Sequence, residues 1–480
     1  MRTSWKPIRS VTPKGFEEMQ KIIKKFSSLS ALAAALLLAG CANLAPTHER
    51  PAAPVAQDWP APAAASGPAA AELPWQQFYA GDARLSQLIE LALKNNRDLR
   101  VALLNVEQAR ALARVSDANR WPTVAAGFSS SRTPGQNDTI TSNYQAGLQI
   151  SAYELDLFGK LKNNSDAALA RYLASAEGGR AAQISLVAGV ASAHLALQAD
   201  EELLALARQT LATREDSLRL IKLKYDKGSA SALDLSGAES AAAAARASLA
   251  QAQRQRDQDE NALVLLIGQP LPAALPASRR LDELRLADVP AGLPSEVLVT
   301  RPDVLQAEQQ LVAANANIGA ARAAFFPSIN LTTSVGTASS QLSDLFSKTA
   351  WSFVGQALLP IFDAGRNQAN LDSAKAAQGI AVAQYEKAVQ TAFREVADAL
   401  AGRATLDEQL KAQLEQARAE AQRLELVELR YRNGVSSSLE LLDAQRSSFA
   451  AQQGLLQVRL AKALNGVSLY KVLGGGVAKS

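Results

Sequence analysis

An internal duplication constrains the fold of this chain more than any other feature of its sequence. Residues 218–268 align without a gap on residues 424–474. A repeat this long is a domain-sized module and not a solenoid unit of about 20–50 residues. We therefore expect two tandem structural repeats, 75–275 and 276–476, followed by a short tail at 477–480. The identities that fix the alignment are Leu218, Leu220, Tyr225, Gly228, Ser231, Leu233, Leu235, Ala238, Leu249 and Gly268, each matched 206 positions later.

Each repeat contains a long segment without proline and with very little glycine, over residues 160–226 and 366–432. About 67 helical residues at roughly 1.5 Å each make a helix of about 100 Å. A break at Gly228 or Gly434 follows, and a second helix returns. Helices this long in a polar chain must bury their apolar stripes against one another, so we expect coiled-coil hairpins over 160–267 and 366–473. A first helix, over 80–120 or 302–325, precedes a proline turn in each repeat.

Four segments alternate apolar and small polar residues with a period of two, which indicates strands with one apolar face. The predicted strands cover 122–133 and 142–157 in the first repeat, and 328–339 and 349–362 in the second. Four strands cannot close a membrane barrel, because the smallest membrane barrels have eight. An open sheet edge in lipid leaves backbone groups unpaired. Two chains give a filled barrel, whereas three chains give twelve strands and a lumen.

The sequence therefore predicts a mainly α-helical chain with a transmembrane β-barrel portion, working as a trimer. A soluble β-sandwich covered by the helices is the alternative. The polar, Ser/Gly/Gln-rich second face of the strands favours the barrel, as does the membrane anchor predicted from the N-terminal segment.

The positive charge of the chain is confined to its N-terminal segment. The formal charge is +4, and residues 1–40 hold seven Lys/Arg against two Glu, so the remainder carries −1. This balance gives no indication of a nucleic-acid partner. A basic stretch from Lys21 to Lys25 and an apolar run from Leu29 to Ala39 read as a signal peptide over 1–40, with Met19 as the expected start.

Leu38-Ala-Gly-Cys41 resembles the lipobox of bacterial lipoproteins and holds the only cysteine of the chain. The resemblance implies cleavage before Cys41 and a diacylglyceryl group on its sulfur. An ordinary buried thiol is the alternative. Two or three acyl chains hold a protein firmly at a membrane, whereas one does not. Ala42 follows in place of aspartate, which favours the outer membrane, and the Pro/Ala-rich residues 41–74 read as an extended tether.

Several short motifs, in order along the duplicated frame, resemble the outer membrane factor family, the TolC/OprM/NodT-like lipoproteins of RND-type tripartite efflux systems. The resemblance covers nearly all of the mature chain. It implies a trimer with a 12-stranded barrel and a 12-helix periplasmic α-barrel. It also implies a periplasmic adaptor and an inner-membrane RND-type transporter as partners. The motifs include Trp121-Pro-Thr-Val124, Asp156-Leu-Phe-Gly-Lys160, Arg301-Pro-Asp-Val304, Pro360-Ile-Phe-Asp-Ala-Gly-Arg366 and Arg430-Tyr-Arg-Asn-Gly-Val435.

The sequence carries no catalytic motif, so we expect no enzyme activity, no cofactor and no metal. His48 lies in the tether. His194 lies on an apolar helix face, where a hydrogen-bonded structural residue is expected. Both methionines precede Cys41, which excludes a thioether-lined copper path in the mature protein.

We expect function to reside at the two hairpin tips. Repeated Gly and Ser residues suit a tight reversal, with Gly at positive φ and Ser capping the returning helix. The resemblance adds that the tips contact an adaptor. The residues concerned are Tyr225, Gly228, Ser231, Leu233, Tyr431, Gly434, Ser437 and Leu439.

The resemblance also implies a periplasmic gate just past the second tip. Leu439 and Asp443 are four residues apart and share a helix face. Three Asp443 carboxylates around a threefold axis would raise one another's pKa and attract cations. An exposed carboxylate facing solvent is the alternative. Gly237 replaces Asp443 in the first repeat, so any gate is asymmetric. The gate residues are Leu439, Glu440, Asp443, Arg430, Tyr431, Arg446 and Asp234.

Three functions remain open at this point. The first is the passive exit duct of an efflux pump, lipid-anchored in the outer membrane. The second is the outer membrane component of a type I protein secretion system. The third is a lipid-anchored coiled-coil scaffold without a pore.

Overall fold

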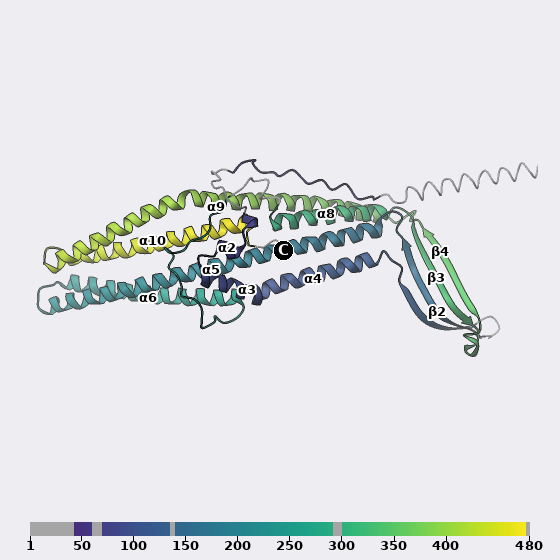
Figure 1. Cartoon of the computed structure of the whole chain (residues 1–480), viewed down its shortest axis with the longest axis horizontal. Helices are drawn as coiled ribbons and strands as arrows, with labels where there is room; N and C mark the ends of the chain where they lie inside the picture. The colour runs from purple at the N-terminus through teal and green to yellow at the C-terminus, as the bar shows by residue number, and fades with distance from the viewer. Residues whose placement is uncertain (1–42, 60–69, 135–139, 291–299, 477–480) are drawn as a thin grey trace, which may run out of the picture. The chain divides into compact units, whose positions relative to one another are not determined.

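The computed structural model describes residues 43–59, 70–134, 140–290 and 300–476. The chain forms two compact units. The sheet unit contains Arg110–Arg171, Leu311–Ala381 and residues 43–49. The helix unit contains the rest. Figure 1 labels the elements of both units.

The sheet unit holds one four-stranded antiparallel sheet with the order β1-β2-β3-β4. Each repeat contributes two strands, as the sequence predicts. β4 ends four residues before the predicted 362, because Pro360 has no N–H for a strand ladder. Within the described residues, β1 and β4 each pair on one side only. The strands are β1 (Val124–Pro134), β2 (Ile140–Leu155), β3 (Ser328–Ser339) and β4 (Thr349–Leu358).

The two faces of the sheet differ as the period-two pattern predicts. One row across the four strands consists of Ala126, Leu148, Val335 and Trp351. The next row, on the other face, consists of Ala125, Gln149, Ser334 and Ser352. The side chain of Trp351 is 77% exposed. A strand face this apolar and this exposed is suited to lipid.

The prediction of a single first helix in the first repeat is wrong. In place of one helix over 80–120 there are two, α3 (Ala83–Asn95) and α4 (Arg97–Ala118). The break is at Asn96, whose side chain accepts a hydrogen bond from the Leu99 N–H (2.8 Å) and donates one to the Leu266 carbonyl (2.8 Å). Asn96 therefore caps α4 and fixes it to a distant helix. The second repeat has a single helix here, α8 (Pro302–Ala323).

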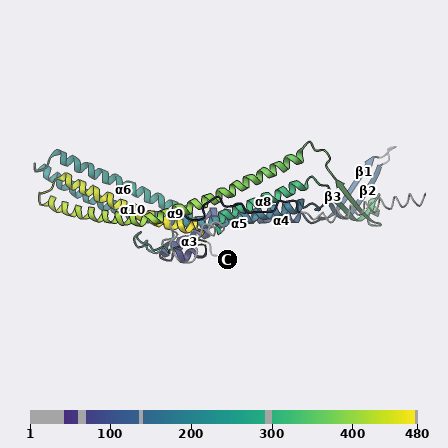
Figure 2. The ribbon, with the colours of Figure 1, turned by 90° about the horizontal axis from the view of Figure 1, so that it is seen from above.

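The long helices form the predicted hairpins. α5 (Lys160–Asp226) is followed by α6 (Ala232–Ile267), and α9 (Arg366–Arg432) by α10 (Ser438–Val472). Figure 2 shows the returning helices α6 and α10. α5 includes an 18-residue window apolar enough to span a bilayer, but 56% of that window is buried in the fold, as in a core helix.

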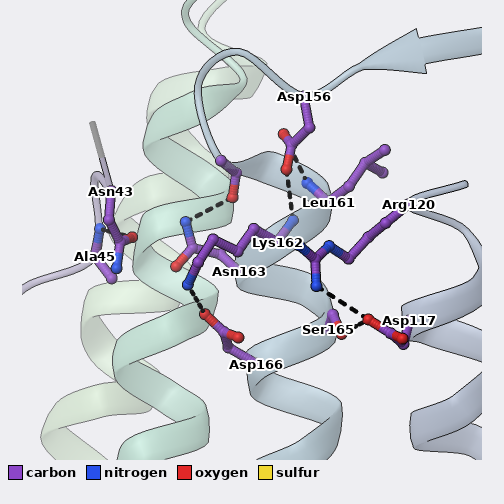
Figure 3. A network of polar contacts seen from close by, with 11 residues as sticks. Asn43, Ala45, Asp117, Arg120, Asp156, Leu161, Lys162, Asn163, Ser165 and Asp166 are labelled. Atoms are coloured by element: carbon purple, nitrogen blue, oxygen red, sulfur yellow. Dashed lines mark hydrogen bonds and ion pairs between the residues drawn. The ribbon is translucent and has the colours of Figure 1, made fainter. Parts of the chain in front are cut away.

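Aspartates cap the starts of both long helices. Asp156 accepts hydrogen bonds from the N–H groups of Leu161 (3.0 Å) and Lys162 (2.6 Å), as Figure 3 shows. Asp363 accepts hydrogen bonds from the N–H groups of Gly365 (3.0 Å), just before α9, and of Asn367 (2.9 Å), in its first turn. Side-chain oxygens at a helix start satisfy N–H groups that have no partner in the helix. Two of the family-like motifs therefore have a structural role.

The core of the helix unit is apolar and aromatic, with one polar cluster. Phe78 and Tyr470 stack at 3.9 Å between ring centroids. His194, 1% exposed, lies with Nε2 3.0 Å from Asp82 Oδ2, and Asp82 caps α3 by accepting from the Leu85 N–H. Burial would raise the pKa of Asp82, but its hydrogen bonds, the strongest from His194, lower it below the ordinary value. The structural role expected for His194 agrees with this geometry.

The described part of the predicted tether is attached to the fold. Arg50 donates two hydrogen bonds to the carboxylate of Glu308, at 2.8 and 2.6 Å. Trp59 stacks on Phe393 with 4.9 Å between ring centroids. Residues 43–59 are extended, as expected from their prolines, but they are held to the surface and do not form a free linker.

Candidate functional site

The two hairpin tips share one backbone design. Gly228 and Gly434 have φ of +73° and +74°, a conformation that favours glycine. Ser231 accepts a hydrogen bond from the Asp234 N–H (3.1 Å), and Ser437 accepts one from the Glu440 N–H (3.2 Å). The repeated Gly and Ser positions therefore have the structural role that the sequence predicts.

Apolar side chains are exposed at both tips. Leu233 is 83% exposed, Leu439 75% and Val435 67%. Tyr225 is 42% exposed. Apolar side chains at the tips of otherwise polar hairpins are a feature of protein contact surfaces. Their contact with a partner stays a prediction.

A side-chain contact links the two tips within one chain. Asp234 accepts hydrogen bonds from the Ser231 N–H and hydroxyl and from the Ser438 hydroxyl. The bonds from Ser231, and then that from Ser438, lower the pKa of Asp234 below its ordinary value. Asp234 was predicted as a gate residue, and here it ties the start of α6 to the start of α10.

Asp443 is held by two arginines. Its Oδ2 accepts from Arg423 at 2.6 Å and its Oδ1 from Arg446 at 2.7 Å. These bonds, the stronger from Arg423, lower the pKa of Asp443. In a single copy the pKa of Asp443 is thus lowered, whereas three Asp443 carboxylates around an axis are expected to raise it. Leu439 and Glu440, one turn before Asp443 on α10, are exposed.

The predicted gate residues Tyr431, Arg446 and Arg430 have different surroundings. Tyr431 is 7% exposed, and the Lys224 ammonium lies 4.3 Å from its ring centroid, so Tyr431 packs between the two hairpins. Arg446 pairs with Asp443. Within the described ranges, the guanidinium of Arg430 makes no hydrogen bond or ion pair.

Sequence reasoning missed Arg423, the nearest partner of Asp443. Arg423 lies eleven residues before Gly434 and Asp443 lies nine after it, so the antiparallel register of the hairpin brings them together. The predicted antiparallel pairing of α9 and α10 was the signal that could have placed Arg423 beside Asp443. Sequence reasoning also missed Arg214 of α5, which lines a groove together with Leu439, Asp443 and Arg446.

Two of the remaining expectations concern lipid and metal. Cys41, the predicted lipidation site, lies outside the described residues. Within the described ranges, no group of three His, Cys, Asp or Glu side chains is placed to hold a metal ion.

Proteins of one family match this chain in sequence over most of its length. The model of a family described as "Outer membrane efflux protein" matches residues 88–269 and 293–475, one match per repeat, which confirms the duplication. The chain is 47% identical over 464 residues to the toluene efflux pump outer membrane protein TtgC and to the antibiotic efflux pump outer membrane protein ArpC, both of Pseudomonas putida. Each alignment covers 94% of this chain and 96% of the relative.

The fold is also similar to a solved channel. The crystal structure of the open state of the Neisseria gonorrhoeae MtrE outer membrane channel matches with a TM-score of 0.85 and 42% sequence identity. The match covers 91% of this chain and 99% of that one.

Proposed function

Because this chain belongs to the outer membrane efflux protein family, and so is the outer membrane channel of an efflux pump, we propose that three copies form one channel. The open sheet is the observation that supports this most. β1 and β4 each leave one edge unpaired within the described residues. Unpaired N–H and C=O groups are too costly in lipid, so the sheet must close with other copies. Twelve strands leave a lumen, whereas eight are filled by side chains.

A comparison of α4 with α8 supports the same assembly. Most residues of α8 are buried or partly buried. It packs on α5 through an alanine cluster that includes Ala167 and Ala313, and on α9 through Gln378, which donates to Asn315 (2.9 Å). α4 has the equivalent place in the first repeat, but its partly shielded residues lie on one face only.

A second face of α4, which is exposed, is an apolar stripe. It consists of Val101 (56% exposed), Leu104 (52%), Leu112 (60%) and Val115 (58%), spaced to lie on one side of the helix. If every repeat follows the packing of α8, α4 lies between α5 of its own chain and α9 of a neighbouring copy. The α4 stripe is then buried in the trimer.

Membership of this family supports a proposal about partners, and the lipobox-like sequence that ends at Cys41 supports one about the anchor. We propose that the exposed leucines of the tips contact a periplasmic adaptor, through which an inner-membrane transporter drives export. We also propose that Cys41 carries the lipid anchor of the mature protein. Mass spectrometry of the mature N-terminal peptide tests this: an unmodified Cys41, or a chain that keeps residues 1–40, contradicts it.

The relatives named for toluene and antibiotic efflux suggest small, largely apolar cargo. Deletion of the gene is expected to raise sensitivity to toluene and to apolar antibiotics, and the intact gene is expected to restore resistance. The measurement is the minimal inhibitory concentration across such a panel. Unchanged sensitivity, combined with loss of a secreted protein, would instead indicate a protein-export duct.

The gate is proposed to be closed in part by the Asp443–Arg423 contact. Arg423→Ala removes a link between α9 and α10 near the second tip, so the two helices of that hairpin move apart more easily. We expect the open fraction of single channels in planar bilayers to rise roughly two- to fivefold, since exposed ion pairs are weak. Arg418→Ala, on the same helix and without an ion pair in the described part of the chain, is the control. An equal effect of both variants would count against this role.

A further inference from the structure

A groove in the helix unit combines a buried arginine with a floor of small residues. We call it the arginine groove. Arg214 of α5, Gly237 of α6, and Asp443 and Arg446 of α10 line it, and its volume is about 340 Å³. The rest of its α6 wall consists of Ser240, Ala241, Ala244, Ala245 and Ser248. A volume of this size is sufficient for a small organic ion.

Arg214 is buried without a carboxylate. It is 7% exposed, and its Nη1 donates to the Gln445 side-chain oxygen (2.7 Å) and the Leu442 carbonyl (3.3 Å). Both acceptors are neutral. Gln445 is oriented by a bond from its own amide nitrogen to the Ser217 hydroxyl (3.2 Å). A buried charge without a counter-charge is costly, and a bound anion removes that cost.

The carboxylate among the residues that line the groove already has partners. Asp443 is shared between Arg423 and Arg446. The groove is therefore lined by two guanidiniums and one carboxylate, which leaves an excess of positive charge. Burial, and then the charge of Arg446, lower the pKa of Arg214.

In the second repeat, the position equivalent to Arg214 carries a charge that has an ion-pair partner. Glu420 stands where the first repeat has Arg214, and it pairs with Arg423 at 3.1 Å. Gly237 stands where the second repeat has Asp443, which leaves open space in the groove. At this position the second hairpin therefore has a charge with a partner in the same hairpin, whereas the first hairpin has Arg214, whose hydrogen-bond acceptors are neutral.

We propose that the arginine groove binds the carboxylate or phosphate group of a small anionic solute, with the guanidiniums of Arg214 and Arg446 as its donors. Guanidinium groups bind both kinds of oxyanion through paired hydrogen bonds. The site lies within one copy of the chain, so its test is independent of the trimer and of transport.

The test uses the full-length protein in detergent, with inorganic phosphate as one probe and succinate as the other. Calorimetric titration is run at constant ionic strength set with sodium chloride. We expect saturable binding by the wild type and a loss of at least about tenfold in affinity for Arg214→Gln, since a paired charged contact is removed. Arg219→Gln, on the same helix but exposed, is the matched control and should bind as the wild type does.

A second variant keeps the test valid if Arg214→Gln does not fold. Gln445→Glu keeps the side-chain size and places a carboxylate against Arg214, so it should abolish anion binding while raising the unfolding midpoint. Stronger binding of one probe identifies the solute class as phosphate-like or carboxylate-like. Absence of binding by the wild type, equal binding by Arg214→Gln, or undiminished binding by Gln445→Glu would each overturn the proposal.

Discussion

Leu104→Glu is expected to convert the trimer into separate chains. The substitution places a carboxylate in the middle of the α4 stripe, where the proposed assembly buries it against α9 of a neighbouring copy. An unpaired buried charge costs several kcal/mol, and the trimer contains three such contacts. We expect the trimer fraction of detergent-solubilised protein to fall by at least about tenfold, as measured by size-exclusion chromatography with light scattering.

Arg110→Glu provides the control for this effect. It places a carboxylate on the same helix at an exposed position, at a rotation of about 120° or more from every residue of the stripe. This variant should remain trimeric. A trimer that tolerates Leu104→Glu as well as Arg110→Glu would show that α4 is not at the interface.

Gly336→Ala is expected to prevent assembly of the sheet. Gly336 pairs with Gly147 at the junction between the strands of the two repeats. A Cβ at Gly336 would lie 2.1 Å from the Ala146 carbonyl oxygen and 2.6 Å from the Gly147 Cα. Both contacts are with backbone, so one strand must move away from the other. Such overpacking costs about 1–3 kcal/mol or more, and unfolded chains are degraded in cells.

The amount of Gly336→Ala protein in purified outer membranes should fall by about tenfold or more. Gly127→Ala is the control on β1, because its Cβ meets only the Gln149 side chain, at 3.5 Å. It should accumulate at the wild-type amount. Normal accumulation of Gly336→Ala would mean that the β2–β3 pairing differs from the one described.

The fold was predictable because its signals are periodic or repeated. Alternation with period two located the strands, and the absence of proline located the long helices. The duplication meant that each signal occurred twice. Gly228 and Gly434 located the two hairpin reversals, because the positive φ that a tight reversal needs favours glycine.

The remaining features depend on contacts that a single segment does not show. The break at Asn96 results from its bond to Leu266, 170 residues away. The pairing of Asp443 with Arg423 depends on the register of a hairpin. Arg214 belongs to the groove only because α5 and α10, from different repeats, pack together. These residues were missed because side-chain partners follow from tertiary packing and not from local pattern.

One chain supplies too little sheet to close in lipid, so we propose that three copies share one barrel. Native mass spectrometry of the mature protein in detergent, combined with conductance of the same sample in planar bilayers, tests it most directly. We predict a particle of three chains that conducts ions. A stable single chain or a two-chain particle, or a three-chain particle that never conducts, would contradict the claim.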